Sequence, residues 1–499
     1  MELFLSNVLC IAVATAVFFL FWKSRRTEYQ KAYERLPPGP SPAPLVGNYF
    51  QLRVKEPYKH YLKLSEKYGS IFTLWFANTP VVVISGYQAL KDSMIGLSEE
   101  FSGRANYPLL LKITEGYGVM VSNGDRWKQL RRFCITTLKN FGMGRQSIEE
   151  KVKEEASYLV QTFSTFGDSA FNPRDLLSEA VCNVICSVVL GRRFKPDDPQ
   201  LKLFIRSINE NLSFLTGSVG QAYNIFPRIV SLFPGKIHEV LSLVKETKAS
   251  LKLEVEARRK TLNPSSPPQD FIEAFLIRME EEKHNPNTAF NFNNLLSTLW
   301  NLFSAGTETT SSTIRQGLLL MMKHPDIQAK IQKEIDEVVG PHRCPSIDDR
   351  RKMPYTDAVI HEVQRRTDIA PTSVPHKMLR DTEFNNYLIP KGAIVLPLLS
   401  SVLTDPKLWK NPNHFDPENF LDEEGRFKKN DAFVPFGMGK RACLGEALAR
   451  VEVFIFITSL LQHFTFKATD PPEQIDTTPL ICSFGRLPRS FECYAVRRT

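Results

Sequence analysis

The chain has 499 residues, of which 42% are hydrophobic, 11% aromatic and 23% charged. This composition excludes a disordered or fibrous protein and is typical of a globular chain with a large aromatic core. The net charge of +9 suits an anionic membrane surface or an acidic protein partner. Zinc-finger spacing and basic tracts with interleaved aromatics are absent from the sequence, so nucleic acid is not expected as a partner. The eight cysteines form no CxxC pair and no regular disulfide framework, which indicates a reducing compartment.

The amino-terminal segment has the properties of a membrane anchor. Leu3–Trp22 contains no charged residue, and twenty helical residues at about 1.5 Å each span about 30 Å, the thickness of the hydrocarbon core. The basic cluster Lys23–Arg26 follows, so the positive-inside rule places the rest of the chain in the cytosol. A cleaved signal peptide would carry its positive charge before a shorter apolar stretch. We therefore expect residues 1–26 to be an uncleaved, single-pass anchor.

A proline-rich stretch, Leu36–Pro44, comes next and cannot form a helix or a central strand. It predicts a linker over residues 27–48 that separates the anchor from one large domain, residues 49–499. Ile71–Phe76 and Val81–Ser85 predict a hairpin, and Ala393–Leu396 predicts another strand. Most of the remainder has helical periodicity: Asp125–Leu138, Ile148–Phe163, Arg174–Leu190, Leu201–Leu215, Gly235–Arg259, Phe292–Met322, Pro325–Val339, Pro354–Arg366 and Glu446–His463. The sequence predicts a mainly α fold with a small β region.

The longest predicted helix, Phe292–Met322, carries only Glu308 and Arg315 as charged residues. A second membrane span is the alternative, but the polar run Ser304–Thr313 lies at its centre, where lipid would penalise it. We therefore expect a central helix that passes through the protein core.

The segment Phe436–Gly445 contains Cys443 just before a predicted helix, where a thiolate is electrostatically favoured. The glycines of the segment would let the backbone approach a flat cofactor closely. A dinucleotide fingerprint is one alternative, but Pro435 interrupts any strand that would lead into it. An inert core thiol is the other. The pattern favours a thiolate that binds haem iron.

Four motifs together resemble the cytochromes P-450. The residues Phe436, Gly439, Arg441, Cys443 and Gly445 resemble the haem-binding loop of that family. Three further motifs follow the family order and spacing: Trp127-x-x-x-Arg131, Ala305-Gly306-Thr307-Glu308-Thr309-Thr310 and Glu362-x-x-Arg365. The likeness extends from the anchor to the end of the chain, and is greatest to the vertebrate microsomal family 2 in Ser102–Arg104, Trp127–Gly144 and Pro371–His376.

The resemblance implies haem b between the long central helix and the Cys443 loop, with Cys443 as the axial iron ligand. It also implies that two buried propionates are held by cationic and indole donors: Arg104, Trp127, Arg131, His376 and Arg441. Phe436, Gly439, Gly445 and Ala305 would contact the cofactor as well.

Glu362 and Arg365 would form a buried structural pair, as in the family, although their spacing alone also allows a surface pair worth ~0.2–0.5 kcal/mol. Asn419 departs from the family here, because many members carry Arg at that position. The usual network of three residues would then be incomplete or would use an amide.

Glu308 and Thr309 are the predicted catalytic pair, because a carboxylate and a hydroxyl at the middle of a buried helix can relay protons. The structural alternative has Thr309 bonded to a preceding backbone carbonyl and Glu308 in a core ion pair.

The resemblance implies a monooxygenase in the endoplasmic reticulum membrane that faces the cytosol and oxidises a lipophilic small molecule: a xenobiotic, fatty acid or steroid. NADPH would supply electrons through a reductase, with cytochrome b-five as an optional donor, at a basic patch of Arg126, Lys128, Arg132, Lys139 and Lys440. Solvated helix charge is the alternative reading of that patch. The implied substrate contacts are Ile113, Tyr117, Val119, Leu215, Asn301, Ala305, Ile369, Val374 and Ile481. The alternatives are an isomerase or dehydratase acting on peroxides, and a haem-binding protein without turnover.

Overall fold

The computed structural model describes residues 35–498 except 53–55, 78, 142–145, 234 and 483–484, together with Val13. The predicted anchor, residues 1–26, and the first part of the predicted linker therefore lie outside the described residues, Val13 apart. Within the described part of the chain, no helix is long and apolar enough to cross a bilayer.

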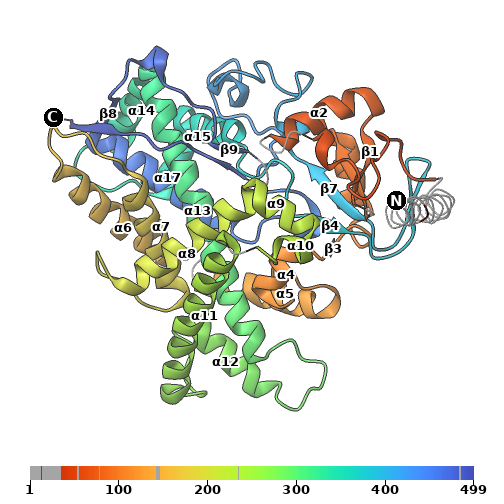
Figure 1. The fold of residues 1–499 in the computed structure, drawn as a ribbon. Helices are drawn as coiled ribbons and strands as arrows, with labels where there is room; N and C mark the ends of the chain where they lie inside the picture. Colours follow the sequence, from red (N-terminus) through yellow and green to blue (C-terminus); the bar gives the residue numbers. More distant parts are fainter. Residues whose placement is uncertain are drawn as a thin grey trace, which may run out of the picture.

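Helices make up most of the described chain, and a smaller β-rich region lies at one side of them (Figure 1). The helices are α2 (Pro57–Tyr68), α3 (Tyr87–Lys91), α4 (Pro108–Thr114), α5 (Gly124–Asn140), α6 (Gln146–Ser164), α7 (Arg174–Val189), α8 (Pro199–Thr216), α9 (Ser218–Ile225), α10 (Pro227–Val230), α11 (Lys236–Thr261), α12 (Phe271–Glu281), α13 (Phe292–Lys323), α14 (Pro325–Val338), α15 (Pro354–Thr367), α16 (Ser400–Leu403) and α17 (Glu446–His463). The predicted mainly α fold is confirmed.

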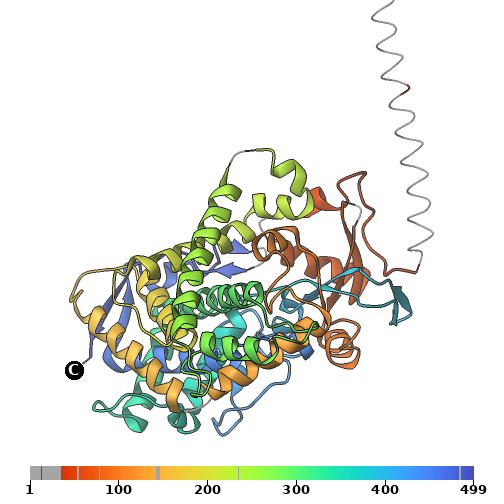
Figure 2. The same cartoon turned by 90° about the horizontal axis from the view of Figure 1, so that it is seen from below.

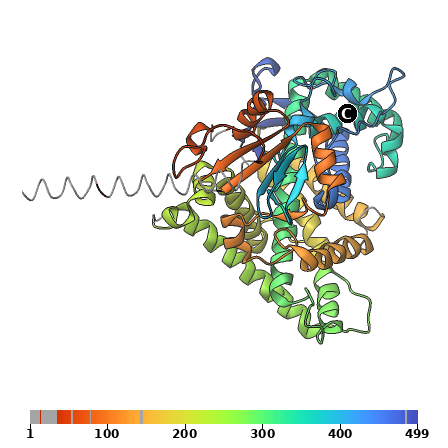
Figure 3. The ribbon, with the colours of Figure 1, turned by 90° about the vertical axis from the view of Figure 1, so that its right-hand side faces the viewer.

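The largest sheet has the strand order β1-β2-β7-β4-β3 (Figure 3). The strands of the chain are β1 (Ile71–Phe76), β2 (Thr79–Ser85), β3 (Gly103–Arg104), β4 (His376–Lys377), β5 (Thr382–Phe384), β6 (Tyr387–Ile389), β7 (Ile394–Leu398), β8 (Phe464–Ala468), β9 (Ile481–Cys482), β10 (Arg486–Leu487) and β11 (Cys493–Arg497). The predicted hairpin is β1 and β2, and β7 pairs parallel to β2. Strands β3 and β4 pair antiparallel, with Arg104 opposite His376.

The periodic segments of the sequence correspond to observed helices with ends that differ by one or two residues. The prediction missed the helices of twelve residues or fewer, whose form depends more on tertiary packing than on periodicity: α2, α3, α4, α9, α10, α12 and α16. It also began the second hairpin strand too late: β2 starts at Thr79, and Pro80 lies opposite Trp75.

Helix α13 runs through the middle of the helical region, where it packs against α7, α8, α11, α15 and α17 (Figure 1). Asn291 caps its first turn by accepting from the Asn294 N–H at 3.0 Å, and Pro325 starts the next helix at once. Apolar and polar residues of its centre, such as Trp300, Thr307 and Ser312, are buried by protein. The expectation of a central core helix is confirmed, and a membrane span is excluded for this segment.

Candidate active site

Cys443 lies between the 3-10 turn η5 (Gly439–Arg441) and the start of α17. Its backbone N–H donates to the Phe436 carbonyl at 2.8 Å, which closes the loop. Desolvation by the surrounding protein raises the pKa of the Cys443 thiol, although backbone N–H groups of Gly445 and Glu446 donate to the sulfur and lower it. The residue is nonetheless exposed. Because the Cys443 thiol is surrounded by protein and yet accessible, we infer that it borders a hollow inside the molecule.

Gly439 is required by the path of the backbone. Its φ is 69°, in the left-handed region, and a Cβ there would lie 1.8 Å from the carbonyl oxygen of Met94. Glycine is thus required at this position because two backbone segments approach each other closely, whether or not a cofactor also lies near. Gly445 has an ordinary φ of −92°, and nothing lies within 4 Å of its Cβ position.

The five predicted propionate residues come together from separate segments of the chain. Arg104 and His376 lie opposite each other on β3 and β4. Trp127 and Arg131 lie one turn apart on α5. The guanidinium carbon of Arg441 is 3.8 Å from the centre of the Trp127 ring, and that of Arg131 is 5.9 Å away. The structure therefore gathers all five side chains into one cluster.

This cluster is positive and short of anions. Arg104 and Arg441 are 7% and 8% exposed. Desolvation, reinforced by the neighbouring guanidinium groups, lowers the pKa of Arg104 to about 9 and that of Arg441 to about 8. Desolvation and the charge of Arg104 also hold the pKa of His376 well below its usual value. Among the described residues, no carboxylate forms an ion pair with Arg104, Arg131 or Arg441.

The arginines bond to backbone carbonyls instead, and these bonds fix their orientation without neutralising them. Arg104 donates to the Val374 carbonyl at 2.7 Å, while its buried Nε has no partner. Arg131 donates to the Ala442 carbonyl at 2.7 Å. Buried cations are costly unless anions and hydrogen bonds compensate them. Two haem propionates would supply that charge, so the residues present fit haem b.

Asn123 is a site residue that the sequence interpretation missed. Its Oδ1 accepts from the Arg104 backbone N–H at 2.6 Å and from the Arg441 guanidinium at 3.4 Å, and its Nδ2 donates to the Arg104 carbonyl at 3.1 Å. The amide thereby joins two segments that carry the cationic cluster. Only its position before helix α5 marks it in the sequence, and that position also suits an ordinary cap.

Ala305 and Thr309 are exposed at the middle of α13, whereas Thr307, Glu308 and Thr310 are buried. Residues four apart share one helix face. Ala305 and Thr309 therefore mark an accessible face of α13, which we infer to border the same hollow, because α13 packs against α17, the helix that follows Cys443.

The structural alternative for Glu308 and Thr309 predicted a hydrogen bond to a backbone carbonyl and a core ion pair, and both are present. The Thr309 hydroxyl donates to the Ala305 carbonyl at 2.7 Å. Glu308 forms an ion pair of 2.9 Å with Arg315, and Ser312 also donates to it at 2.9 Å. These contacts fix the positions of both side chains. They do not by themselves assign a role in turnover to either group. The sequence signal for Arg315 is its spacing, because residues seven apart share a helix face.

Glu362 and Arg365 form a pair with fully buried side chains and bonds of 2.7 Å. Arg365 also donates to the carbonyl groups of Leu403, Pro412 and His414. The Asn419 amide reaches Glu362 at 3.4 Å, so an amide takes the third place in this network. The pair is thus buried and connects α15 to the loops that lead to the Cys443 segment.

The predicted substrate residues have different environments. Ile113, Val119 and Leu215 are buried members of the main apolar core, and Val374 packs against it partly buried. Asn301 is 3% exposed, and its Oδ1 accepts from the Met120 N–H at 3.2 Å. Tyr117 and Ile369 are partly buried, and the side chain of Ile481 lies outside the described part. Ala305 alone of this set is exposed toward the hollow.

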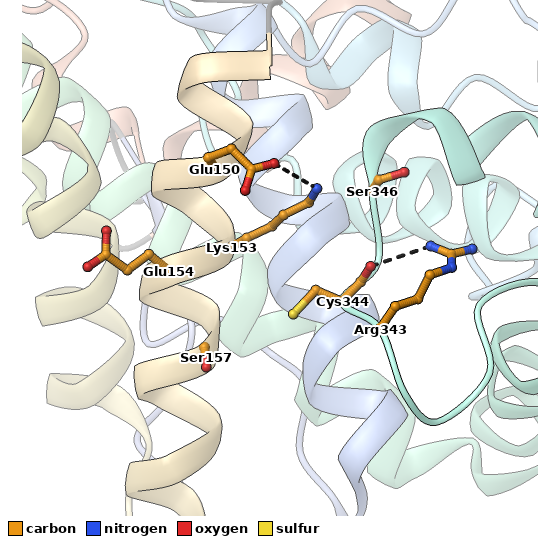
Figure 4. A pocket seen from close by; sticks show the side chains of 7 residues that line it. All are labelled: Glu150, Lys153, Glu154, Ser157, Arg343, Cys344 and Ser346. Atoms are coloured by element: carbon orange, nitrogen blue, oxygen red, sulfur yellow. Dashed lines mark hydrogen bonds and ion pairs between the residues drawn. The ribbon is translucent and has the colours of Figure 1, made fainter.

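A second hollow lies on the surface between α6 and the loop that precedes η3 (Ile347–Lys352), far from the Cys443 loop in the sequence (Figure 4). Lys153, Glu154 and Cys344 line it with other polar residues. None of the predicted site residues belongs to it. Within the described chain, no group of histidine, cysteine and acidic side chains could hold a metal ion by itself.

Comparison with known proteins decides the family. The model of the family described as Cytochrome P450 matches residues 37–493. The chain belongs to the cytochrome P450 family. It is 58% identical to cytochrome P450 2M1 of Oncorhynchus mykiss over 99% of this chain and 98% of that protein. It is 48% identical to cytochrome P450 2G1 of Oryctolagus cuniculus over 93% and 94%, and 46% identical to cytochrome P450 2C8 of Homo sapiens over 99% of each chain.

The P450 is a haem-thiolate monooxygenase for lipophilic or foreign molecules, with haem b as its cofactor and NADPH as its electron source through a reductase. The family 2 relatives favour this activity over peroxide rearrangement and over haem binding without turnover. When bound, haem supplies the iron centre for oxygen activation, and the polypeptide supplies binding, orientation and protons.

Proposed function

We propose that Cys443 holds the haem iron in this monooxygenase and that Arg104, Trp127, Arg131, His376 and Arg441 hold the propionates. The main support is the cluster of largely buried arginines, which has no carboxylate partner among the described residues and lies at the loop that carries the exposed Cys443. Phe436, Gly439 and Gly445 shape that loop. Ala305 borders the hollow, where the cofactor face and the substrate meet.

The first test is the carbon monoxide difference spectrum of the dithionite-reduced protein. The wild type should give the strongly red-shifted Soret band of thiolate-ligated haem, and Cys443→Ser should lose it. Cys344→Ser is the matched control, because Cys344 is also exposed but lies at the surface hollow. A band typical of histidine ligation in the wild type would contradict the proposal.

Glu308 and Thr309 are proposed to deliver the protons that reduction of one oxygen atom to water consumes. Thr309 faces the hollow, and Glu308 precedes it on the same helix. General acid–base groups typically contribute about 10²–10⁴-fold to a rate. Glu308→Gln and Thr309→Ala should therefore raise the hydrogen peroxide released per NADPH consumed. An unchanged ratio in both variants would exclude this role.

We propose the membrane location and domain plan that the sequence predicts: an anchor over residues 1–26, a linker over 27–48 and a cytosolic catalytic domain over 49–499. An apolar surface supports this plan. Leu45, Phe50, Ile229, Leu232 and Phe233 are between 56% and 79% exposed. The rings of Tyr49 and Phe226 are 6.2 Å apart, so the chain after the linker lies beside α9 and α10 (Figure 2).

Such exposed apolar side chains are costly in water and suit a bilayer surface. The full chain in endoplasmic reticulum vesicles should therefore resist extraction by alkaline carbonate. Added protease should degrade the catalytic domain from the outer, cytosolic side. Release of the chain by carbonate, or protection from protease, would contradict the anchor or its orientation.

The proposed partner is a membrane-bound NADPH–cytochrome P450 reductase, with cytochrome b-five as an optional second donor. The basic side chains of Arg126, Lys128, Arg132 and Lys139 are exposed along α5, the helix that also carries Trp127 and Arg131. Lys440 is exposed in the Cys443 loop, where it pairs with Glu99. This face could attract an acidic partner close to the cofactor.

A further inference from the structure

Glu308, Ser312 and Arg315 form a closed triangle of hydrogen bonds inside α13. Arg315 donates to the Glu308 Oε1 at 2.9 Å and to the Ser312 hydroxyl at 2.8 Å, and that hydroxyl donates to the same Oε1 at 2.9 Å. The Arg315 and Glu308 side chains are 3% and 2% exposed. The spacings of four and three residues place all of them on one helix face.

This triangle fixes one oxygen of the Glu308 carboxylate beside Ser312 and Arg315. Successive helix residues are about 100° apart around the axis, so Ser312 lies near the exposed face of Ala305 and Thr309, and Glu308 and Arg315 lie further around the helix. The other carboxylate oxygen, Glu308 Oε2, is buried and has no hydrogen-bond partner among the described residues. One oxygen of Glu308 is therefore held by two hydrogen bonds, and the other is held by none of the described residues.

Charged residues of a neighbouring helix also act on Arg315. Arg174 and Asp175, in the first turn of α7, act on its electrostatics: desolvation lowers the pKa of Arg315 most, Glu308 and Asp175 raise it, and Arg174 lowers it further. Asp175 is exposed to solvent. Charged groups of α7, one of them exposed, are therefore near enough to Arg315 to act on it electrostatically.

We infer that Arg315 is a positioning residue for proton delivery: it fixes the orientation of Glu308, so that the unpaired Oε2 can relay protons toward Thr309. The inference rests on the proposed role of Glu308. Without the guanidinium, the ion pair with Glu308 would be lost, and the orientation of the carboxylate would no longer be fixed. Protons would then reach the site of oxygen reduction more slowly, and hydrogen peroxide would leave in place of water and oxidised product.

The test measures product formed and hydrogen peroxide released per NADPH consumed, with full-length protein, reductase and ethoxycoumarin as the lipophilic probe. Arg315→Met should lower the product yield per NADPH by about tenfold, less than the ~100-fold typical of losing an acid–base group itself. It should also raise the solvent deuterium isotope effect. Arg315→Lys, which keeps a positive charge, should recover part of the coupling.

Arg258→Met is the matched control. Arg258 forms a 2.8 Å pair with Asp270, whose side chain is 1% exposed, outside the candidate active site. Its loss should leave the ratio of product to NADPH as in the wild type. An Arg315→Met variant that behaves like this control would overturn the inference.

A double-mutant cycle decides whether Arg315 acts through Glu308. Glu308→Gln combined with Arg315→Met removes both charges, so the double variant avoids an uncompensated buried ion if the single variant fails to fold. Its coupling should equal that of Glu308→Gln alone, and additive losses would overturn the inference.

The same measurements show which assignment is wrong: the role of Arg315, the role of Glu308 or the haem-thiolate site. If Glu308→Gln uncouples the enzyme and Arg315→Met does not, only the inference about Arg315 is wrong. If Glu308→Gln is as coupled as the wild type, the proposed role of Glu308 is wrong too. Absence of the red-shifted carbon monoxide band in every variant and in the wild type would instead remove the haem-thiolate assignment.

Discussion

At the scale of single residues, Glu452 on α17 is a buried carboxyl group that pairs with no positive group in the described part of the chain. It is 1% exposed, and its Oε1 has no hydrogen-bond partner. Desolvation raises the pKa of Glu452 well above its usual value, and a hydrogen bond from Thr310 only partly opposes this effect. The folded protein therefore keeps this group protonated at pH values where the unfolded chain ionises it.

Because the pKa of Glu452 is raised in the folded protein, protonated Glu452 contributes its full stabilisation below the ordinary glutamate pKa. This contribution is lost as pH rises toward the raised pKa. Glu452→Gln removes the titration and nearly preserves shape. We expect the variant to gain stability relative to the wild type as pH increases from 5 to 8, by at most about 1.4 kcal/mol per pH unit. Thermal unfolding across that range is the measurement, and a constant difference would contradict the assignment.

The Glu362–Arg365 pair is the second case in which burial determines the cost of a substitution. Glu362→Ala leaves Arg365 charged and fully buried, which should cost about 3–5 kcal/mol and reduce haem incorporation. Glu281→Ala is the control, since Glu281 pairs with Arg278 at the same spacing but both side chains are about half exposed. It should cost less than ~1 kcal/mol. Denaturant unfolding and haem content per chain measure both effects.

At the scale of elements, the Cys443 loop depends on one backbone crossing. Gly439→Ala would place a Cβ within 1.8 Å of the Met94 carbonyl oxygen at a φ of 69°. Gly437 is a matched control: its φ is also positive, at 77°, but the nearest atom to its Cβ position is 3.9 Å away. We expect Gly439→Ala to lose most of the red-shifted carbon monoxide band and Gly437→Ala to keep most of it. Equal losses would mean that strain in φ alone determines the effect.

Helix α5 combines a buried face and a basic face. Trp127 is buried beside the cationic cluster, while Lys128 and Arg132 are exposed. Lys128→Glu combined with Arg132→Glu should slow reduction by the reductase by about tenfold at low ionic strength, and the difference should shrink as salt screens the charges. Stopped-flow reduction under carbon monoxide measures this rate. Lys252→Glu on α11, an exposed lysine of another element, should have no such effect.

At the scale of the whole molecule, the cationic cluster makes stability depend on the cofactor. A bound group stabilises the folded state by mass action, and haem would also supply the missing negative charge. Removal of haem should therefore lower the Tm. Arg104→Met should lower the Tm of the haem-loaded protein and raise that of the haem-free protein, because an unpaired buried cation is costly. Differential scanning calorimetry of both forms tests this, and a change of the same sign in both would contradict it.

The sequence by itself determined the helices with strong periodicity, the central position of the segment around Thr307 and the pairing of β1 with β2. These features follow from local apolar spacing and from polarity that lipid would reject. Cys443 and its motif are equally local. The small helices α9 and α10 were not predictable in this way, since few apolar positions mark them and packing sustains them.

Only the tertiary structure decided which charges meet. Arg104, Arg131 and Arg441 lie far apart along the chain, and their proximity depends on the pairing of β3 with β4 and on the packing of α5 beside the Cys443 loop. The same holds for the burial of Glu452, for Asn123 and for the orientation of Glu308 toward Arg315. Electrostatic energies depend on distance and on the surrounding dielectric, and both quantities exist only once the chain has folded.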